Sequence, residues 1–267
     1  MGTLYIIATP LGNLGDITLR ALETLKSVDL VACEDTRETI KLLNHYNISK
    51  PLVSYFQHSK LSKIEYLAGE LSAGKNIALV TDAGTPGISD PGGKLVHQLV
   101  SSSVGQFETD KLKNRQTEKL NIVPIPGPCA AIAALSISGF PTDKFIFMGF
   151  PPHKKGRDKY FKEVAAAKET VVFYESTHRI LKTLEQLAEV MRINPPPFLS
   201  LAKQNSSSDL PLVKGEKERG LRQLVVCREL TKIFESIYRG TAEEILDILK
   251  SDKNNQKGEF VVIVRAS

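Results

Sequence analysis

The sequence predicts an α/β protein with two domains, the first built on a mostly parallel sheet with flanking helices. Short apolar runs that are typical of buried strands alternate with segments whose apolar residues recur at helical spacing. Residues 77–80, for example, form such a run, and residues 94–100 form the helical pattern that follows it. This alternation of strands and helices indicates a doubly wound sheet. Polar loops rich in glycine and proline follow several strands, where open α/β sheets bind their ligands.

Residues 1–140 form the predicted N-terminal domain. Strands are expected at 4–9, 28–33, 51–55, 77–80 and 121–125. Helices are expected at 18–27, 59–73 and 94–100. One further helix is expected to end at about residue 46, and another to begin at residue 129. Residues 101–119 are serine-rich and nearly devoid of apolar side chains, which predicts a mobile, exposed insertion. Residues 139–143 are expected to act as a hinge between the domains.

Residues 141–267 form the predicted C-terminal domain, for which a mixed sheet is expected. Its strands are placed at 145–150, 170–174, 224–227 and 257–264, and its helices at 180–191 and 241–250. Thr241 and Glu244 have the spacing of a capping box at the start of the last helix. Residues 194–220 open with three prolines and contain a serine run, so a second exposed insertion is expected there.

Composition limits the classes of protein to consider. The 267 residues carry a formal charge of +5, which suits an anionic partner. The three cysteines form no C-x-x-C pair, and no apolar run approaches the roughly 20 residues of a membrane span. The start of the chain has no positively charged leader. A cytoplasmic protein that does not enter a membrane is therefore expected. The histidines and cysteines show no metal-ligand spacing, so no metal site is predicted.

The glycine-bearing loop at residues 81–92 is the first candidate for a ligand site. Its glycines permit close backbone approach, and Pro86 and Pro91 restrict its shape. Asp82 can accept a hydrogen bond from a ligand hydroxyl or amine. An ordinary βα turn would have a similar composition, but such turns usually span about two to six residues. The length of this loop favours a function.

Two further loops carry charged residues whose function is open. Residues 34–37 follow a strand and either face a ligand or cap the next helix, and both interpretations can hold together. The basic loop at 151–159 suits phosphate contacts, although a charge run is more often simply solvated. His178 has no visible acidic partner and is interpreted as a helix-start or phosphate-facing residue.

Seven motifs appear in order along the chain, at residues 8–16, 34–37, 82–86 with 90–92, 126–131, 173–179, 228–232 and 257–259. Together they resemble the small-subunit ribosomal RNA 2′-O-ribose methyltransferases of the tetrapyrrole-methylase-like superfamily. The resemblance covers nearly the whole chain apart from the two expected insertions. Members of that family commonly continue with a basic helical segment, whereas this chain stops at residue 267.

The resemblance implies S-adenosylmethionine as methyl donor, bound in a cleft between the two domains, and a homodimer. The implied substrate is a cytidine ribose in the decoding region of 16S ribosomal RNA, in free RNA or in the assembled small subunit. Carried over by motif, the implied cofactor-binding residues are Leu14, Asp82, Ala83, Gly84, Thr85, Pro86, Cys129, Ala130, Tyr174 and Glu175.

Removal of the ribose hydroxyl proton calls for a basic group within hydrogen-bond reach. The hypothesis from strand-end position and motif is that the catalytic residues are Glu34, Asp35, Glu229 and Lys232. Substrate phosphates would be held by Arg37, Arg179, Lys154 and Lys155. The alternative for the first group is a salt-bridge cluster between domains.

Three other functions are alternatives to this assignment. Methylation of a tetrapyrrole ring carbon uses the same fold, but the loop motifs and the basic charge favour RNA. A non-catalytic ribosome-binding protein is a second alternative, and robust cofactor binding would count against it. A dinucleotide-dependent oxidoreductase is disfavoured because the first loop has G-x-x-G spacing and not G-x-G-x-x-G.

Overall fold

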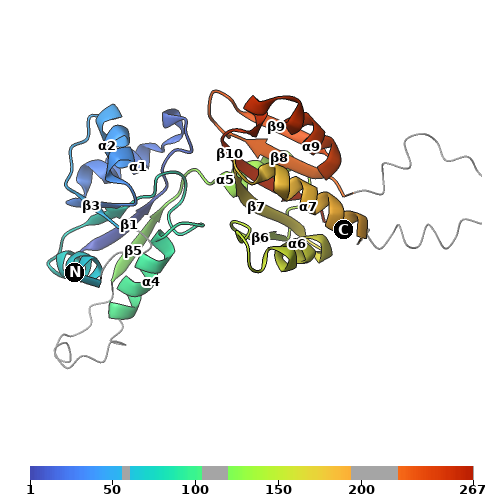
Figure 1. Ribbon diagram of the computed structural model, residues 1–267. Helices are drawn as coiled ribbons and strands as arrows, with labels where there is room; N and C mark the ends of the chain where they lie inside the picture. The colour runs from blue at the N-terminus through green and yellow to red at the C-terminus, as the bar shows by residue number, and fades with distance from the viewer. Residues whose placement is uncertain (56–60, 104–119, 194–221, 267) are drawn as a thin grey trace, which may run out of the picture. The chain divides into compact units, whose positions relative to one another are not determined.

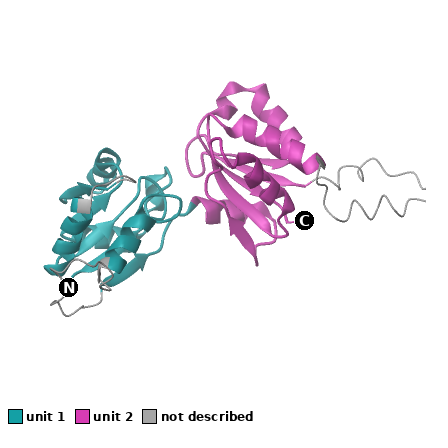
Figure 2. Cartoon of the chain, turned by 60° about the horizontal axis from the view of Figure 1, so that its bottom comes forward, with its two compact units in different colours: residues 1–129 teal, residues 130–267 magenta. Residues whose placement is uncertain are grey.

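The computed structural model describes residues 1–55, 61–103, 120–193 and 222–266 (Figure 1). The chain divides into two compact units, residues 1–129 and 130–267 (Figure 2). The predicted boundary at residue 140 stays a prediction. Most of the two expected insertions, 104–119 and 194–220, lies outside the described residues, while 101–103 continue a helix. None of the described helices has the length and apolar character of a membrane span.

The first unit contains a parallel five-stranded sheet in the order β3-β2-β4-β1-β5. Its strands are β1 (Thr3–Ile7), β2 (Leu30–Cys33), β3 (Leu52–Ser54), β4 (Ile77–Leu79) and β5 (Asn121–Ile125). Its helices are α1 (Leu19–Ser27), α2 (Thr36–His45), α3 (Leu61–Ser72) and α4 (Gly92–Ser103). A short 3-10 helix, η1 (Leu14–Asp16), precedes α1.

The helices cover both faces of this sheet. Ile77 and Leu79 of β4 pack in one core with residues of α3 and α4, while Ala78 packs in another with residues of α1 and α2. Figure 1 shows α4 on the opposite side of the sheet from α1 and α2. Strand β1 leads to α1 and its neighbour β4 leads to α4. The pair β1 and β4 is therefore a topological switch point, where such sheets bind ligands.

The second unit contains a mixed five-stranded sheet in the order β6-β7-β10-β8-β9. Strands β6 and β7 are parallel, and the other neighbours are antiparallel. The strands are β6 (Phe145–Phe147), β7 (Thr170–Ser176), β8 (Leu224–Arg228), β9 (Ser236–Gly240) and β10 (Glu259–Val264). The helices are α5 (Ala130–Ser138), α6 (Arg157–Ala166), α7 (Ile180–Ile193) and α9 (Ala242–Ser251), with η2 (Lys253–Gln256) before β10.

One core joins three of these helices to the sheet. Phe161 of α6, Leu184 of α7 and Ile245 of α9 are fully buried together with Phe173 of β7 and Val262 of β10. The expected fold class, with a parallel and a mixed sheet in two α/β units, is confirmed. Strand β9 was not among the expected strands.

Local signals at helix starts are also confirmed. Thr241 accepts a hydrogen bond from the backbone of Glu244 and the Glu244 side chain accepts one from Thr241, which completes the predicted capping box of α9. Asp35 caps α2 by accepting a hydrogen bond from the Arg37 backbone. The helix-cap interpretation of residues 34–37 is therefore right, and it leaves the ligand interpretation open.

Candidate functional site

Hydrogen bonds join three loops at the carboxyl edge of the first sheet. Thr9, after β1, and Gly84, after β4, exchange two backbone hydrogen bonds of 2.9 and 3.0 Å. The Thr9 hydroxyl also donates to the Thr81 carbonyl at 3.0 Å. The Thr85 hydroxyl donates to the Pro128 carbonyl, after β5, at 2.9 Å. The switch point therefore has a rim fixed by contacts within the protein.

The loop at 81–92 is ordered by hydrogen bonds between the Asp90 side chain and its own backbone. Asp90 accepts hydrogen bonds from the Gly87 and Gly92 backbone at 2.8 and 2.7 Å. Gly84 has φ +85°, which only glycine adopts readily, and a Cβ there would lie 3.3 Å from Leu11 Cδ2. A side chain at Gly84 would therefore crowd Leu11, and glycine lets the loops after β1 and β4 pack closely. The functional interpretation of this loop, based on its length, stays a prediction.

Three acidic residues from two loops come together beside this rim. The backbone N–H of Asp35 donates to Asp82 Oδ1 at 3.0 Å, and the Thr81 hydroxyl donates to Glu34 Oε2 at 2.9 Å. Burial raises the pKa of Glu34, and the Thr81 hydrogen bond opposes this only partly. Burial likewise raises the pKa of Asp82, against a lowering effect of the Asp35 backbone. Glu34 and Asp82 are therefore the more basic carboxylates here.

Asp35 has the opposite electrostatic setting. Its carboxylate accepts a 2.6 Å hydrogen bond from Arg37 Nη2, and Arg37 Nε and backbone N–H add further bonds. These bonds hold the pKa of Asp35 at about 2. The Arg37 side chain is 84% exposed, so its guanidinium still faces solvent. Asp35 is thus a fixed anion that orients Arg37 at the start of α2.

The other predicted residues of the first unit lie in the same loops. Leu14 begins η1, is exposed, and its carbonyl accepts a hydrogen bond from the Tyr46 hydroxyl. Ala83 is exposed and Pro86 is buried. Cys129 is half-buried and unpaired in any disulfide. Their contact with a cofactor stays a prediction.

In the second unit, the side chain of Tyr174, in β7, contacts the start of α5. Its hydroxyl accepts a hydrogen bond from the Ala131 backbone at 3.2 Å, and its ring packs edge-on against Phe147 and Phe150. Ala130 is the first residue of α5. The predicted pair Tyr174 and Ala130 is therefore brought together by the fold of this unit.

Glu175 belongs to a buried ion-pair network. Its side chain is 0% exposed and accepts hydrogen bonds from Thr183 Oγ1 at 2.6 Å and Arg179 Nη2 at 2.8 Å, with Arg157 Nη1 at 3.7 Å. Arg157 donates in turn to Thr183 Oγ1 and Gln186 Oε1. Burial lowers the pKa of Arg157, although the Glu175 charge opposes it. The predicted cofactor contact of Glu175 and substrate contact of Arg179 stay predictions.

Sequence reasoning missed the burial of Arg157. This residue stands in the basic loop at 151–159, which has the composition of a solvated loop, yet its side chain is only 5% exposed. Its Nη1 also donates to the Pro152 carbonyl at 3.2 Å, which fixes the loop. Lys154 and Lys155 are exposed in that loop. No local signal separates Arg157 from its exposed neighbours.

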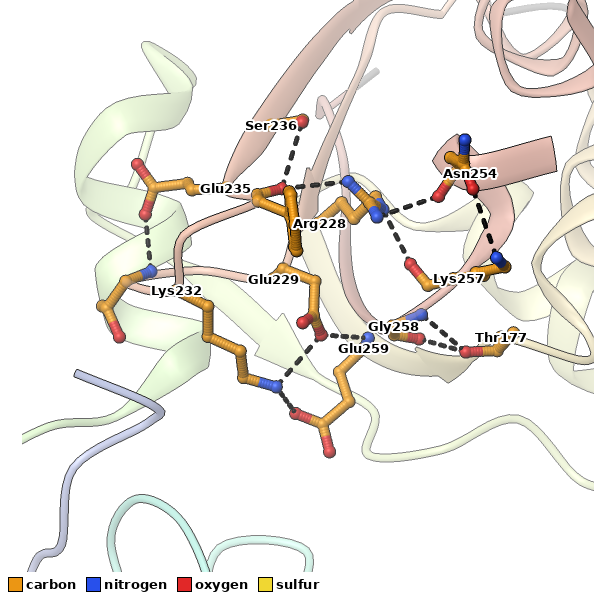
Figure 3. Close-up of polar contacts among 12 residues, drawn as sticks. Thr177, Arg228, Glu229, Lys232, Glu235, Ser236, Asn254, Lys257, Gly258 and Glu259 are labelled. Atoms are coloured by element: carbon orange, nitrogen blue, oxygen red, sulfur yellow. Dashed lines mark hydrogen bonds and ion pairs between the residues drawn. The ribbon is translucent and has the colours of Figure 1, made fainter. Parts of the chain in front are cut away.

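Glu229 and Lys232 form a second charged cluster at the end of β8 (Figure 3). Lys232 Nζ lies 3.0 Å from Glu229 Oε1 and 3.0 Å from Glu259 Oε2, at the start of β10. Burial favours a higher pKa for Glu229, but hydrogen bonds from the Glu259 backbone and Lys232 outweigh it and lower the pKa. Burial favours a lower pKa for Lys232, but its bonds to Glu259 and Glu229 raise it. Both groups are therefore charged at neutral pH.

The backbone of this cluster is strained and firmly anchored. Glu229 and Thr231 have φ +50° and +67°, a region that residues with side chains rarely adopt and that often marks functional sites. Arg228, just before them, donates to the carbonyls of Lys257, Phe234 and Asn254 at 2.7 to 2.9 Å. The fold thus holds the loop after β8 in one arrangement.

A family model described as tetrapyrrole (corrin/porphyrin) methylases matches residues 3–246. The chain is 42% identical over 264 residues to "Ribosomal RNA small subunit methyltransferase I" of Escherichia coli O157:H7, covering 98% of this chain and 77% of the relative. Identity to the protein of the same name in Haemophilus influenzae is also 42% over 264 residues, covering 98% and 78%. Among solved structures, uroporphyrin-III C-methyltransferase from Thermus thermophilus, complexed with S-adenyl homocysteine, aligns with a TM-score of 0.57 at 14% identity, covering 99% and 97%.

Proposed function

Because the chain belongs to the tetrapyrrole methylase family, in its ribosomal RNA small subunit methyltransferase I branch, we propose that it methylates the 2′-oxygen of a cytidine ribose in the decoding region of 16S ribosomal RNA. The proposal rests mainly on 42% identity over nearly the whole chain to a relative of that name. We further propose S-adenosylmethionine as the methyl donor, a cytoplasmic location and a homodimer.

The first unit has residues that fit this donor. At its carboxyl edge the exposed Asp82 carboxylate can accept a hydrogen bond from a hydroxyl or ammonium group, and the small, exposed Ala83 leaves room for close backbone contact. Thr85 and Pro128 fix the neighbouring loop. When bound, S-adenosylmethionine supplies a methyl group on a positively charged sulfur, which makes that carbon an acceptor for an oxygen nucleophile.

The chain's own contribution to the chemistry is orientation and removal of one proton. Alignment of the ribose 2′-oxygen with the methyl carbon accounts for much of the acceleration. Of the three carboxylates predicted to be catalytic, Glu34 is the one with a raised pKa, which suits a general base, and we assign it the hydroxyl proton. Asp35 and Glu229 have lowered pKa values and serve to hold cations in place.

The positively charged side chains among the candidate residues bind the phosphates of the RNA backbone. Lys232 stays protonated because its pKa is raised, so it acts as a positive charge and not as a base. Arg37 presents a guanidinium that is 84% exposed. Lys154, Lys155 and Arg179 remain candidates for further phosphate contacts. Such contacts position an RNA without reading its sequence.

Radiolabelled methyl transfer from S-adenosylmethionine to undermethylated small ribosomal subunits tests the proposal. We expect label on one decoding-region cytidine, with the 2′-oxygen identified by protection of its phosphodiester from alkaline cleavage. Cofactor binding in calorimetry without any transfer to RNA would contradict the proposed substrate and favour a tetrapyrrole. Absence of both binding and transfer would favour a non-catalytic ribosome-binding protein.

A further inference from the structure

The ammonium group of Lys232 lies between two carboxylates that differ in exposure (Figure 3). Both Glu229 Oε1 and Glu259 Oε2 are 3.0 Å from Lys232 Nζ. The Glu229 side chain is 17% exposed, whereas the Glu259 side chain is 78% exposed. The two ion pairs therefore differ in how readily another anion can replace them.

Glu229 is the fixed partner. Its Oε1 also accepts the Glu259 backbone N–H at 2.9 Å, and its own backbone N–H donates to the Glu259 carbonyl at 2.9 Å. The Lys232 backbone N–H donates to the Glu229 carbonyl at 3.0 Å. Thr177 Oγ1 holds both the N–H and the carbonyl of the adjacent Gly258. Lys232 consequently keeps its place whether or not the Glu259 carboxylate is present.

Glu259 is the replaceable partner. Its carboxylate projects into solvent and meets Lys232 through one oxygen. Exposed ion pairs of this kind contribute little, because water and side-chain entropy compete with them. A phosphate is an equally good acceptor for an ammonium group and carries at least as much charge.

We propose that Lys232 binds a phosphate of the RNA substrate and that Glu259 is the counter-ion which the RNA displaces. This inference rests on the proposed function and adds to it a residue that sets specificity. An isolated anion gains little by exchanging one exposed ion pair for another. An RNA that is already bound at several other points can replace the Glu259 carboxylate with one of its phosphates. Glu259 therefore weakens the binding of nucleic acid that is incorrectly placed.

Substitution Glu259→Gln, compared with Glu185→Gln, tests the inference. Glu185 of α7 forms a similar exposed pair with Lys250 of α9 at 2.9 Å, so both variants remove one negative charge from one lysine. Affinity for undermethylated small subunits is measured over a range of salt concentrations. We expect E259Q to bind about two- to fivefold more tightly, from the weakness of exposed pairs. We expect E185Q to bind like the wild type.

The salt dependence separates this role from a change in global charge. In the wild type the contact of Lys232 with a phosphate frees the Glu259 carboxylate, which offsets the charge gained, whereas in E259Q nothing offsets it; the slope of log K against log salt is then steeper by up to about 0.7. E259Q should show this steeper slope and E185Q should not. In a Lys232→Gln background, E259Q should change neither affinity nor slope, because the cation it exposes is gone.

Each outcome has a distinct meaning. If E259Q behaves like E185Q while the wild type methylates the RNA, the displacement model is wrong and the proposed function stands. If E259Q still tightens binding when Lys232 is absent, Glu259 acts only through long-range charge and the model is again wrong. If the wild type neither binds nor methylates the RNA, the inference and the proposed function fail together.

Discussion

Substitution of Gly258 by alanine should destabilise the second unit by a predictable amount. Gly258 has φ +99°, and forcing a residue with a side chain into this region costs roughly 1–3 kcal/mol. A Cβ there would lie 2.4 Å from Glu229 Cγ, so the Glu229 side chain must move. That movement breaks its bond to the Glu259 backbone, which contributes about 1 kcal/mol. The sum is roughly 2–4 kcal/mol.

Thermal denaturation followed by circular dichroism measures this cost. A loss of 2–4 kcal/mol in a unit of this size lowers the melting temperature by roughly 8–16 °C. Hydrogen exchange of β8 and β10 should accelerate in the variant and so assign the loss to the second sheet. A melting temperature within about 2 °C of the wild type would refute the reasoning from φ and from the Cβ contact.

Gly69→Ala is the matched control. Gly69 lies in α3, a Cβ there meets nothing within 4 Å, and its φ is not in the left-handed region. Alanine in a helix interior is more favourable than glycine by about 0.5–1 kcal/mol. The same chemical change should therefore stabilise the first unit while it destabilises the second.

Two further predictions concern carboxylates. Glu175→Gln leaves the buried guanidinium of Arg157 and the half-buried guanidinium of Arg179 without their counter-charge, so we expect a loss of about 3–5 kcal/mol in urea denaturation. Thr81→Val removes the hydrogen bond that lowers the pKa of Glu34, so that pKa rises further. Because ionised Glu34 is the proposed base, the acid limb of the kcat/KM profile should move to higher pH.

Each of these predictions has its own control. Glu185→Gln removes an exposed pair and should change stability by less than about 1 kcal/mol, so equal losses in E185Q and E175Q would contradict the network's role. For the pH profile, Glu34→Gln should abolish the acid limb together with most activity. A T81V profile that coincides with the wild type would show that another group accepts the proton.

Local signals in the sequence were sufficient for much of the fold. The capping box at Thr241 and Glu244 depends only on residues three apart, and the structure confirms it. A helix cap within residues 34–37 was one of two interpretations for the same reason, and Asp35 forms it. The alternation of strands and helices in the first unit likewise depends on neighbouring residues. Such features depend on hydrogen bonds and patterns among residues that are close together in the sequence.

Features that depend on distant partners were not predictable in this way. The residues next to Arg157 in sequence are those of an exposed basic loop, whereas its burial depends on an ion pair with Glu175 in another element. Glu259 reaches Lys232 because the register of β10 pairs Phe260 with Arg228. Strand β9 alternates half-buried and exposed residues at a sheet edge, so it lacks the apolar run of a central strand.

The position of β10 in the second sheet has a consequence for the order of folding during synthesis. This strand is the last of the sheet along the chain, yet it lies in the middle and joins β7 to β8. The first sheet is complete once β5 has left the ribosome. The second sheet cannot form completely until residues 259–264 emerge. Until then, β7 and the β8–β9 hairpin lack the strand that lies between them and joins them. A nascent chain arrested before β10 should therefore contain a folded first unit and an open second one.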